Sequence, residues 1–442
     1  MSAKPSLPQS LWAATAIAPG HYPEARGNIT VQTVVVGAGY TGLSAALHLA
    51  AAGQNVLVLE SAEPGWGASG RNGGQIISGL KIHPDELEAM FGAQAGARMA
   101  LTMGTSSELV YSLIDRYGIE CHDRRTGWIQ AAHAPVAMDD MLRKRFAQWN
   151  ARGVDSKLLD RDQAAAMIGC APGNYVGAWV DPRGGVLQPM SWARGLAAAV
   201  VKEGGRIAAN SPVTRLREEG NRWVVETPAA VVSAERVLLA TNAYTDHLWP
   251  GLRQTVVPVS SFQAATVPLP EDIRKTILPG GQGVTDTRRL LHYFRLDHTG
   301  RLVMGGRSPV DDDPTLADAD SLRRAIARTF PQAAGVPLEF VWSGKVALTK
   351  DSLPHIHILA PNLFTALGCN GRGVANAAML GKLLASLATG TPPGELAIPV
   401  TAPDRFLFHA FQRVGVLAAA TYYRVLDQLE TQRRGTMDTW QR

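Results

Sequence analysis

The stretch VQTVVVGAGYTGLSAALHLAAAGQNVLVLE, residues 31–60, decides the fold. It begins with a β-branched apolar run that is typical of a strand buried on both faces. A glycine pattern, GAGYTG, leads into an alanine- and leucine-rich helix over 43–52 and then into a second apolar strand over 55–59, which runs into Glu60. Strand, glycine turn, helix, strand and terminal acid, in this order, predict a Rossmann-like dinucleotide-binding unit.

Each glycine of this pattern has its own task in such a unit. Gly37 allows the tight turn, Gly39 lets the backbone approach a pyrophosphate, and Gly42 lets the helix pack closely on the strand. The helix start at Tyr40 and Thr41 offers free N–H groups to the phosphates, and Glu60 can accept hydrogen bonds from ribose hydroxyls. We therefore expect these residues to bind the cofactor.

A long loop of small residues, SAEPGWGASGRNGGQIISG over 61–79, follows the acid where a nicotinamide-binding domain would continue with further strand–helix units. Such a loop suits the extended body of a flavin dinucleotide, although a plain surface loop is the alternative. The cofactor contacts expected in this loop are Ser61, Ala68, Ser69, Arg71, Asn72, Gly73 and Gly74.

A second strand–glycine–helix unit lies near the C-terminus, with a strand over 362–367 and a helix over 374–388. A helix start there would favour the negative charge that a reduced flavin carries, and a structural turn is the alternative. Two further strand-like runs, 205–213 and 236–242, end near the same crevice. The cofactor contacts expected from these segments are Gly371, Arg372, Gly373, Val374, Val213, Thr241 and Asn242.

Composition narrows the class of protein. Of 442 residues 46% are apolar and 18% are charged, which excludes intrinsic disorder and permits a large core. The net charge of +5 without a long basic run argues against a nucleic-acid partner, and three distant cysteines form neither a disulfide framework nor a metal site. The longest apolar stretches are too short to span a membrane, and 11–18 lacks the features of a secretory signal. A soluble cytoplasmic enzyme is expected.

Several segments together give the chain a family resemblance: SLWAATA (10–16), VVVGAGYTGLSAALHLA (34–50), GASGRNGGQ (67–75), LLATNAYT (238–245) and VWSGKVALTKDSLPHIH (341–357). They resemble the D-amino-acid oxidase, glycine oxidase and sarcosine oxidase superfamily of FAD enzymes. Within it, the branches most similar are gamma-glutamylputrescine oxidoreductases and L-pipecolate oxidases. The arginine of Gly371-Arg372-Gly373, where many relatives have histidine, fits the branch that oxidises amino and imino acids.

The resemblance implies an α/β fold with a discontinuous Rossmann-like FAD-binding lobe and an interleaved α+β substrate lobe built on an antiparallel sheet. The expected division is an N-terminal arm (1–29), an FAD-binding lobe (30–80, 181–250 and 352–398), a substrate-binding lobe (81–180 and 251–351) and a C-terminal helical tail (399–442). No cysteine lies in 345–353, where sarcosine-oxidase-like members attach flavin, so non-covalent FAD is expected.

The implied reaction is oxidation of a small amine or amino/imino acid by hydride transfer to flavin, giving an imine that hydrolyses. O₂ or a quinone would take the electrons. The alternatives are a gamma-glutamylputrescine-type oxidase of polyamine catabolism and a quinone-linked amino-acid dehydrogenase. Two interpretations outside FAD-dependent amine oxidation are also open. One is a nicotinamide dehydrogenase, which would leave the long 61–79 loop unexplained, and the other is a non-catalytic FAD-binding module.

Four side chains are the candidates for the catalytic site: Tyr293, Arg295, Lys345 and Arg372. Arg295 and Arg372, with Arg307, are candidate clamps for a substrate carboxylate, which an arginine fork can bind through both oxygens. Tyr293 would face the flavin, and Lys345 would be a fixed positive charge that promotes oxygen reduction. Ordinary packed or solvated side chains are the alternative for each of them, and no metal site is expected.

The tail beyond residue 399 has apolar and aromatic residues at helical spacing over 406–429, interspersed with arginines. A helix packed on the FAD lobe is the first interpretation. Contact with a membrane surface or with an electron-accepting partner is the second.

Overall fold

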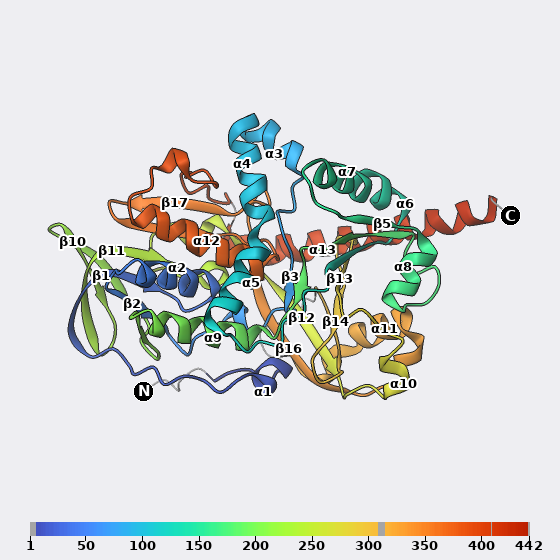
Figure 1. Cartoon of the computed structure of the whole chain (residues 1–442), viewed down its shortest axis with the longest axis horizontal. Helices are drawn as coiled ribbons and strands as arrows, with labels where there is room; N and C mark the ends of the chain where they lie inside the picture. The colour runs from blue at the N-terminus through green and yellow to red at the C-terminus, as the bar shows by residue number, and fades with distance from the viewer. Residues whose placement is uncertain (1–5, 308–313, 408, 441–442) are drawn as a thin grey trace.

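The structure, a computed structural model, describes residues 6–307, 314–407 and 409–440, without the side chains of 410, 413 and 432–440. The outer ends of the predicted arm and tail, residues 308–313 of the predicted substrate lobe, and the Arg413 side chain therefore lie outside the described residues. Two eight-stranded sheets organise the chain (Figure 1).

The first sheet contains the predicted dinucleotide-binding unit. Its main path runs β17-β18-β11-β1-β2-β8, with a β9–β10 hairpin added beside β11. The strands are β1 (Gly27–Val36), β2 (Val56–Leu59), β8 (Arg206–Ala208), β9 (Arg215–Glu219), β10 (Arg222–Glu226), β11 (Ala230–Leu239), β17 (His355–Ala360) and β18 (Leu363–Leu367). From β18 to β8 neighbouring strands are parallel, which confirms the Rossmann-like prediction.

Helices α2 (Tyr40–Ala51), α9 (Pro189–Lys202) and α12 (Gly373–Ala388) pack on one face of this sheet (Figure 1). The helices α2 and α12 come from opposite ends of the chain, yet they touch closely. A Cβ atom on Gly381 would lie 2.4 Å from the carbonyl oxygen of Thr41, and the Ser44 hydroxyl donates to the Ala378 carbonyl at 2.6 Å. Small residues therefore bring the two helix starts to the same edge of the sheet.

The second sheet has the order β16-β12-β15-β14-β13-β4-β6-β5. Its strands are β4 (Trp128–Ala132), β5 (Lys157–Leu159), β6 (Gly177–Asp181), β12 (Val257–Thr266), β13 (Gly283–Asp286), β14 (Tyr293–Leu296), β15 (Leu302–Arg307) and β16 (Leu338–Leu348). Pairing is antiparallel except between β13 and β4, so the expectation of an antiparallel sheet holds with one exception. These two strands belong to separate chain segments, and the long connection between them permits parallel pairing.

The two sheets draw their strands from different ranges of the chain. Those of the first lie within or next to the ranges expected for the FAD-binding lobe, and those of the second within or next to the ranges expected for the substrate lobe. We propose that the sheets are the cores of these two lobes. The predicted N-terminal arm carries α1 (Leu11–Thr15), whose buried Trp12 packs edge-on against Trp342 of β16 at 5.8 Å between ring centroids.

Three helices follow the 61–79 loop in the chain and precede the first strand of the second sheet: α3 (Pro84–Phe91), α4 (Ala93–Gly104) and α5 (Ser106–Tyr117). The break between α3 and α4 falls at Gly92, which has a φ of +82°. Further helices border the second sheet: α7 (Arg143–Ala151), α8 (Arg161–Ile168), α10 (Glu271–Arg274) and α11 (Asp320–Thr329).

The chain ends in α13 (Gln412–Trp440), whose last turns project past the rest of the molecule (Figure 1). Its hydrogen bonds to the body reach His133 and the segment 289–290, which border the second sheet. The expectation that the tail packs on the FAD lobe is therefore wrong for this helix. Its carboxylates Asp427 and Glu430 form ion pairs with Arg289, which lies beside the second sheet. Among the described residues, no helix combines the length and the apolarity needed to cross a membrane.

Candidate active site

A cavity of about 720 Å³ lies between the two sheets. The parallel strands β1, β2 and β11 open into it at their carboxyl ends, through Gly37, Glu60 and Thr241. Ligands bind at this edge of open α/β sheets. Tyr293 and Gln263 of the second sheet form the opposite wall. The volume falls in the upper part of the range of about 300–1,000 Å³ for ligand pockets, so a dinucleotide-sized cofactor has room.

The cavity gathers nearly all the residues that the sequence singles out. Lining it are Gly37, Gly39, Tyr40, Thr41, Glu60, Ser61, Ala68, Ser69, Arg71, Asn72, Gly73, Val213, Thr241, Asn242, Gly371, Arg372, Gly373 and Val374, together with Tyr293, Arg307 and Lys345. Three predicted residues lie outside the lining: Gly42, Gly74 and Arg295.

The glycine turn has the form that a bound pyrophosphate needs. Gly37 has a φ of +102°, which side-chain-bearing residues rarely adopt. A Cβ atom on Gly39 would lie 3.0 Å from the Ser69 hydroxyl, which accepts a hydrogen bond from the Tyr40 amide at 2.9 Å. Neither α2 nor α12 has a side-chain cap, so two helix starts offer amide groups to this cavity. These features fit an anionic dinucleotide such as FAD.

Glu60 is held in place by the turn it faces. Its carboxylate accepts hydrogen bonds from the amides of Ala38 at 2.7 Å and Ala62 at 2.9 Å, and from the Ser61 hydroxyl at 3.1 Å. Burial raises the pKa of Glu60, and these hydrogen bonds oppose the rise. The acid therefore supports the glycine turn and also lies on the wall of the cavity, where ribose hydroxyls would be bound.

Side chains of the 61–79 loop mainly fix the shape of the loop. Asn72 donates to the Tyr40 hydroxyl at 3.1 Å and to the Ser69 carbonyl at 2.8 Å, and accepts from the Gly74 amide at 2.8 Å. Arg71 donates from Nε to the Trp66 carbonyl at 2.8 Å. Ser69 and Asn72, expected as direct donors to the cofactor, are thus engaged within the protein, and the loop backbone is left to face the cavity.

Arg295 does not reach the cavity, and the expectation that it clamps a substrate is wrong. Its guanidinium donates to the carbonyls of Gly74 at 2.9 Å and of Leu296 at 3.2 Å, and also to that of Leu187. The side chain is 2% exposed, and burial lowers its pKa to about 10. The alternation that places Arg295 on the same face as Tyr293 could not show that the 61–79 loop covers it.

We expect Arg295→Met to lower the free energy of unfolding by about 3 kcal/mol, because three buried carbonyls lose their charged donor. Arg324→Met, on an exposed face of α11, is the matched control and should stay within about 0.5 kcal/mol of the parent protein. Urea unfolding followed by circular dichroism measures both. Equal stabilities of the two variants would contradict the structural role.

A group of cations forms one end of the cavity: Lys81, Arg145, Arg307 and Arg372. Arg372 donates to the carbonyls of Ser78 at 3.0 Å and Leu80 at 2.7 Å, and burial with the nearby Arg145 lowers its pKa. Within the described part of the chain, Lys81 Nζ and the Arg307 guanidinium have neither a hydrogen bond nor an ion pair.

Sequence reasoning missed Lys81 and Arg145. Lys81 follows the 61–79 loop closely, and this position was its one available signal. Arg145 lies on α7 within a helical pattern that looks ordinary, and its Nη2 donates to the Lys81 carbonyl at 2.7 Å. Burial, together with the charges of Arg307 and Arg372, lowers the pKa of Lys81 to about 8.

The other two candidates occupy the wall between the lobes. The Tyr293 hydroxyl is 2.8 Å from that of Ser261, and burial raises its pKa. A Cβ atom on Gly73 would lie 2.7 Å from the Tyr293 ring, so the loop passes directly beside this tyrosine. Lys345 places its Nζ 5.7 Å from the centroid of the Tyr244 ring. Both side chains line the cavity, where they could contact a bound cofactor.

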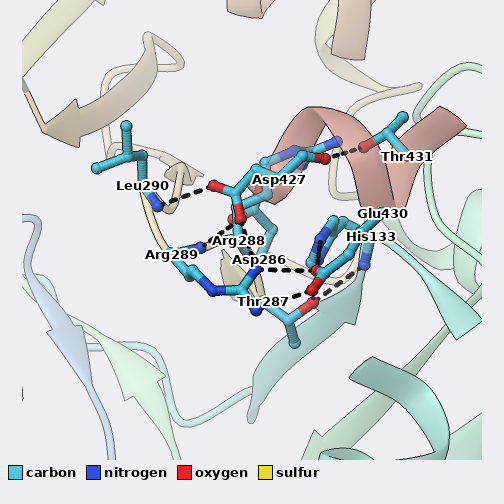
Figure 2. A network of polar contacts seen from close by, with 9 residues as sticks. All are labelled: His133, Asp286, Thr287, Arg288, Arg289, Leu290, Asp427, Glu430 and Thr431. Atoms are coloured by element: carbon cyan, nitrogen blue, oxygen red, sulfur yellow. Dashed lines mark hydrogen bonds and ion pairs between the residues drawn. The ribbon is translucent and has the colours of Figure 1, made fainter. Parts of the chain in front are cut away.

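The segment 286–291 forms another part of the wall and is fixed by a polar network (Figure 2). Asp286 accepts hydrogen bonds from the Arg288 amide at 3.2 Å and the His292 amide at 3.0 Å. Burial would raise the pKa of Asp286, but the Arg288 guanidinium and the interactions with His292 together outweigh it and hold the pKa well below its usual value. The result is a rigid wall segment.

Sequence comparison places the chain among known proteins. Residues 32–387 match the family described as FAD dependent oxidoreductase. The chain is 34% identical over 433 residues to the gamma-glutamylputrescine oxidoreductase of Escherichia coli, covering 92% of this chain and 99% of that protein. It is 32% identical over 404 residues to a probable oxidoreductase, OrdL, of Haemophilus influenzae, covering 89% of this chain and 91% of that protein.

Solved structures share the fold. Glycine oxidase from Geobacillus kaustophilus superposes with a TM-score of 0.69 at 22% identity, covering 85% of this chain and 97% of that one. The L-proline dehydrogenase from P. horikoshii superposes with a TM-score of 0.68 at 22% identity, covering 83% and 94%. The family match also decides between FAD and a nicotinamide cofactor. Fold, cavity and sequence agree, and the chain belongs to the FAD dependent oxidoreductase family.

Proposed function

We propose that this enzyme oxidises a small amine that carries a carboxylate, such as an amino or imino acid. The observation that carries the proposal is the pair of cations, Lys81 and Arg307, that face the cavity without a hydrogen-bonding partner in the described chain. A carboxylate bound there would satisfy both side chains through charge-assisted hydrogen bonds.

In this proposal some residues of the chain bind the cofactor and others bind the substrate. The glycine turn, Glu60, the 61–79 loop and the starts of α2 and α12 hold FAD non-covalently, and Tyr293 and Lys345 contact it from the substrate side. Bound FAD supplies the acceptor for a hydride from the carbon next to the amine. Lys81 and Arg307 orient the substrate by its carboxylate, and the resulting imine hydrolyses in water.

The relative from Escherichia coli supports a variant of the same idea. Its name gives gamma-glutamylputrescine as its substrate, and a glutamyl group also carries a carboxylate. Polyamine catabolism is therefore the second candidate role. We further propose a cytoplasmic location and either O₂ or a quinone as the electron acceptor; the three free cysteines suit a reducing compartment.

Anaerobic bleaching of the flavin, measured with matched pairs of amines, tests the substrate class. L-pipecolate with piperidine, L-proline with pyrrolidine, and gamma-glutamylputrescine with putrescine differ within each pair by the group that bears the carboxylate. We expect the carboxylate-bearing member of one pair to bleach the flavin at least about 100-fold more efficiently. Equal rates within every pair would contradict the proposed anchor, and absence of bleaching by any amine would indicate a non-catalytic FAD protein. Reoxidation in air then separates oxidase from dehydrogenase.

Lys81 gives substrate binding a predictable pH dependence. With a pKa near 8, it is charged below this pH and loses its charge as the pH rises through it. A carboxylate inhibitor without an amine should therefore bind more weakly above about pH 8, by at most about tenfold per pH unit. Kd values from flavin difference spectra between pH 6 and pH 10, roughly spanning this pKa, measure the effect. In Lys81→Met the profile should be flat, and an unchanged profile would exclude Lys81 as its origin.

A further inference from the structure

The helix α13 has two unlike faces. Val416, Ala419, Leu426, Asp427 and Glu430 lie on one side of the helix and are buried or half-buried. The residues of the opposite face are exposed. A helix that buries its only apolar side against a protein exposes mainly polar residues. In α13 many of the exposed residues are apolar instead.

Polar contacts hold the inner face to the body (Figure 2). Asp427, 7% exposed, accepts hydrogen bonds from the amides of Arg289 and Leu290, both at 3.1 Å. Glu430 accepts from Arg289 at 2.8 Å and lies 3.2 Å from Nε2 of His133. Both carboxylates of the helix, within the part whose side chains are described, are therefore neutralised by the protein itself.

The outer face is an apolar stripe, which consists of Val414, Ala418, Tyr422, Val425 and Leu429. Their spacing of three or four residues aligns them along four turns of helix. Val414 is 66% exposed and Tyr422 is 61% exposed, and Phe411, just before the helix, is 67% exposed. A contiguous exposed apolar surface of this kind marks a site of interaction.

The charged residues near the stripe indicate what kind of partner it binds. Residues 405–434 contain five arginines and two acids, and the two acids are Asp427 and Glu430 of the inner face. Arg424 is exposed beside the stripe. An apolar face with aromatic residues, flanked by arginines, is the composition of a helix that lies in the interface of an anionic membrane. A second copy of the chain would bring the same arginines against each other.

We propose that α13 docks this protein on an anionic lipid surface, with the stripe inserted among the lipids and its inner face fastened to the cavity wall at Arg289. The helix lies on the membrane and does not span it. The proposal is independent of the substrate class, so its failure would leave amine oxidation untouched.

Flotation of the full-length flavoprotein with vesicles tests the docking. We expect it to float with phosphatidylcholine vesicles that contain about one third phosphatidylglycerol and to stay behind with phosphatidylcholine alone. The combined substitution Val414→Ser, Tyr422→Ser and Leu429→Ser should reduce flotation at least about tenfold. The matched control replaces three exposed apolar residues elsewhere, Met90→Ser, Leu101→Ser and Val201→Ser, and should float like the parent.

Two further measurements keep the result unambiguous. Bound flavin and Tm should be unchanged in the stripe variant, since its three substituted residues are exposed. If either changes, Arg424→Gln and added salt provide the test instead. Each of these should weaken flotation of the folded protein. A parent protein that never floats, or a folded stripe variant that floats equally well, would overturn the proposal. So would light scattering that shows a parent dimer and a monomeric stripe variant, because the stripe would then bind a second copy.

Discussion

Gly42→Val should yield a protein without bound FAD and with a free energy of unfolding lowered by about 3 kcal/mol. A Cβ atom at this position would lie 1.9 Å from the carbonyl oxygen of Gly37 and 3.2 Å from the Val35 side chain. The carbonyl belongs to the glycine turn, so it cannot move aside without deforming the wall of the cavity. The helix would have to shift away from β1, and the start of α2 would leave the cavity.

The flavin absorbance of the purified protein and its urea unfolding curve measure this effect. Gly335→Val is the matched control, because nothing lies within 4 Å of a Cβ atom there. It should retain FAD and unfold within about 0.5 kcal/mol of the parent. A Gly42→Val protein that keeps its flavin would show that close packing of helix and strand is not what shapes the turn.

Arg307→Met should raise KM for a carboxylate-bearing amine by about 10- to 150-fold, the equivalent of losing one charged hydrogen bond of about 1.5–3 kcal/mol. Arg307 ends β15 and lines the cavity. Burial lowers its pKa, yet the described chain offers it no carboxylate. A substrate anion would therefore be its first close partner, and the bond would be lost on substitution.

Steady-state kinetics with both members of each amine pair check the assignment. The KM of the amine without a carboxylate should change by less than about threefold, because that substrate makes no contact with the cation. Arg307→Lys keeps a charge and should recover part of the loss. An equal rise of KM for both members would indicate a general distortion of the cavity, and no rise would remove Arg307 from the substrate site.

The dinucleotide-binding unit was predictable because its signals are local. The expected helix over 43–52 corresponds to α2 (Tyr40–Ala51), and the expected strands over 55–59 and 362–367 correspond to β2 (Val56–Leu59) and β18 (Leu363–Leu367). Buried strands and glycine-led helices have composition and periodicity that can be read within about 15 residues. The cofactor contacts expected from these segments nearly all line one cavity.

The cationic end of the cavity could not be predicted in the same way. Lys81, Arg145 and Arg307 come from a loop, a helix and a strand end that the sequence does not relate to one another. Only the tertiary arrangement brings these three cations together. Arg295 does not join them, because the 61–79 loop covers it and binds its guanidinium through the Gly74 carbonyl. Side-chain alternation gives the face of a strand, but not what lies on that face.

The closeness of α2 to α12 also has a consequence for how the protein is made. The ribosome delivers β1, α2 and β2 early, but α12 begins at Gly373. At roughly 5–20 residues per second, the starts of α2 and α12 are separated by on the order of half a minute of translation. During that time a nascent chain that carries the glycine turn lacks the second helix start that borders the cavity. The complete cofactor cavity can therefore form only after α12 has been synthesised.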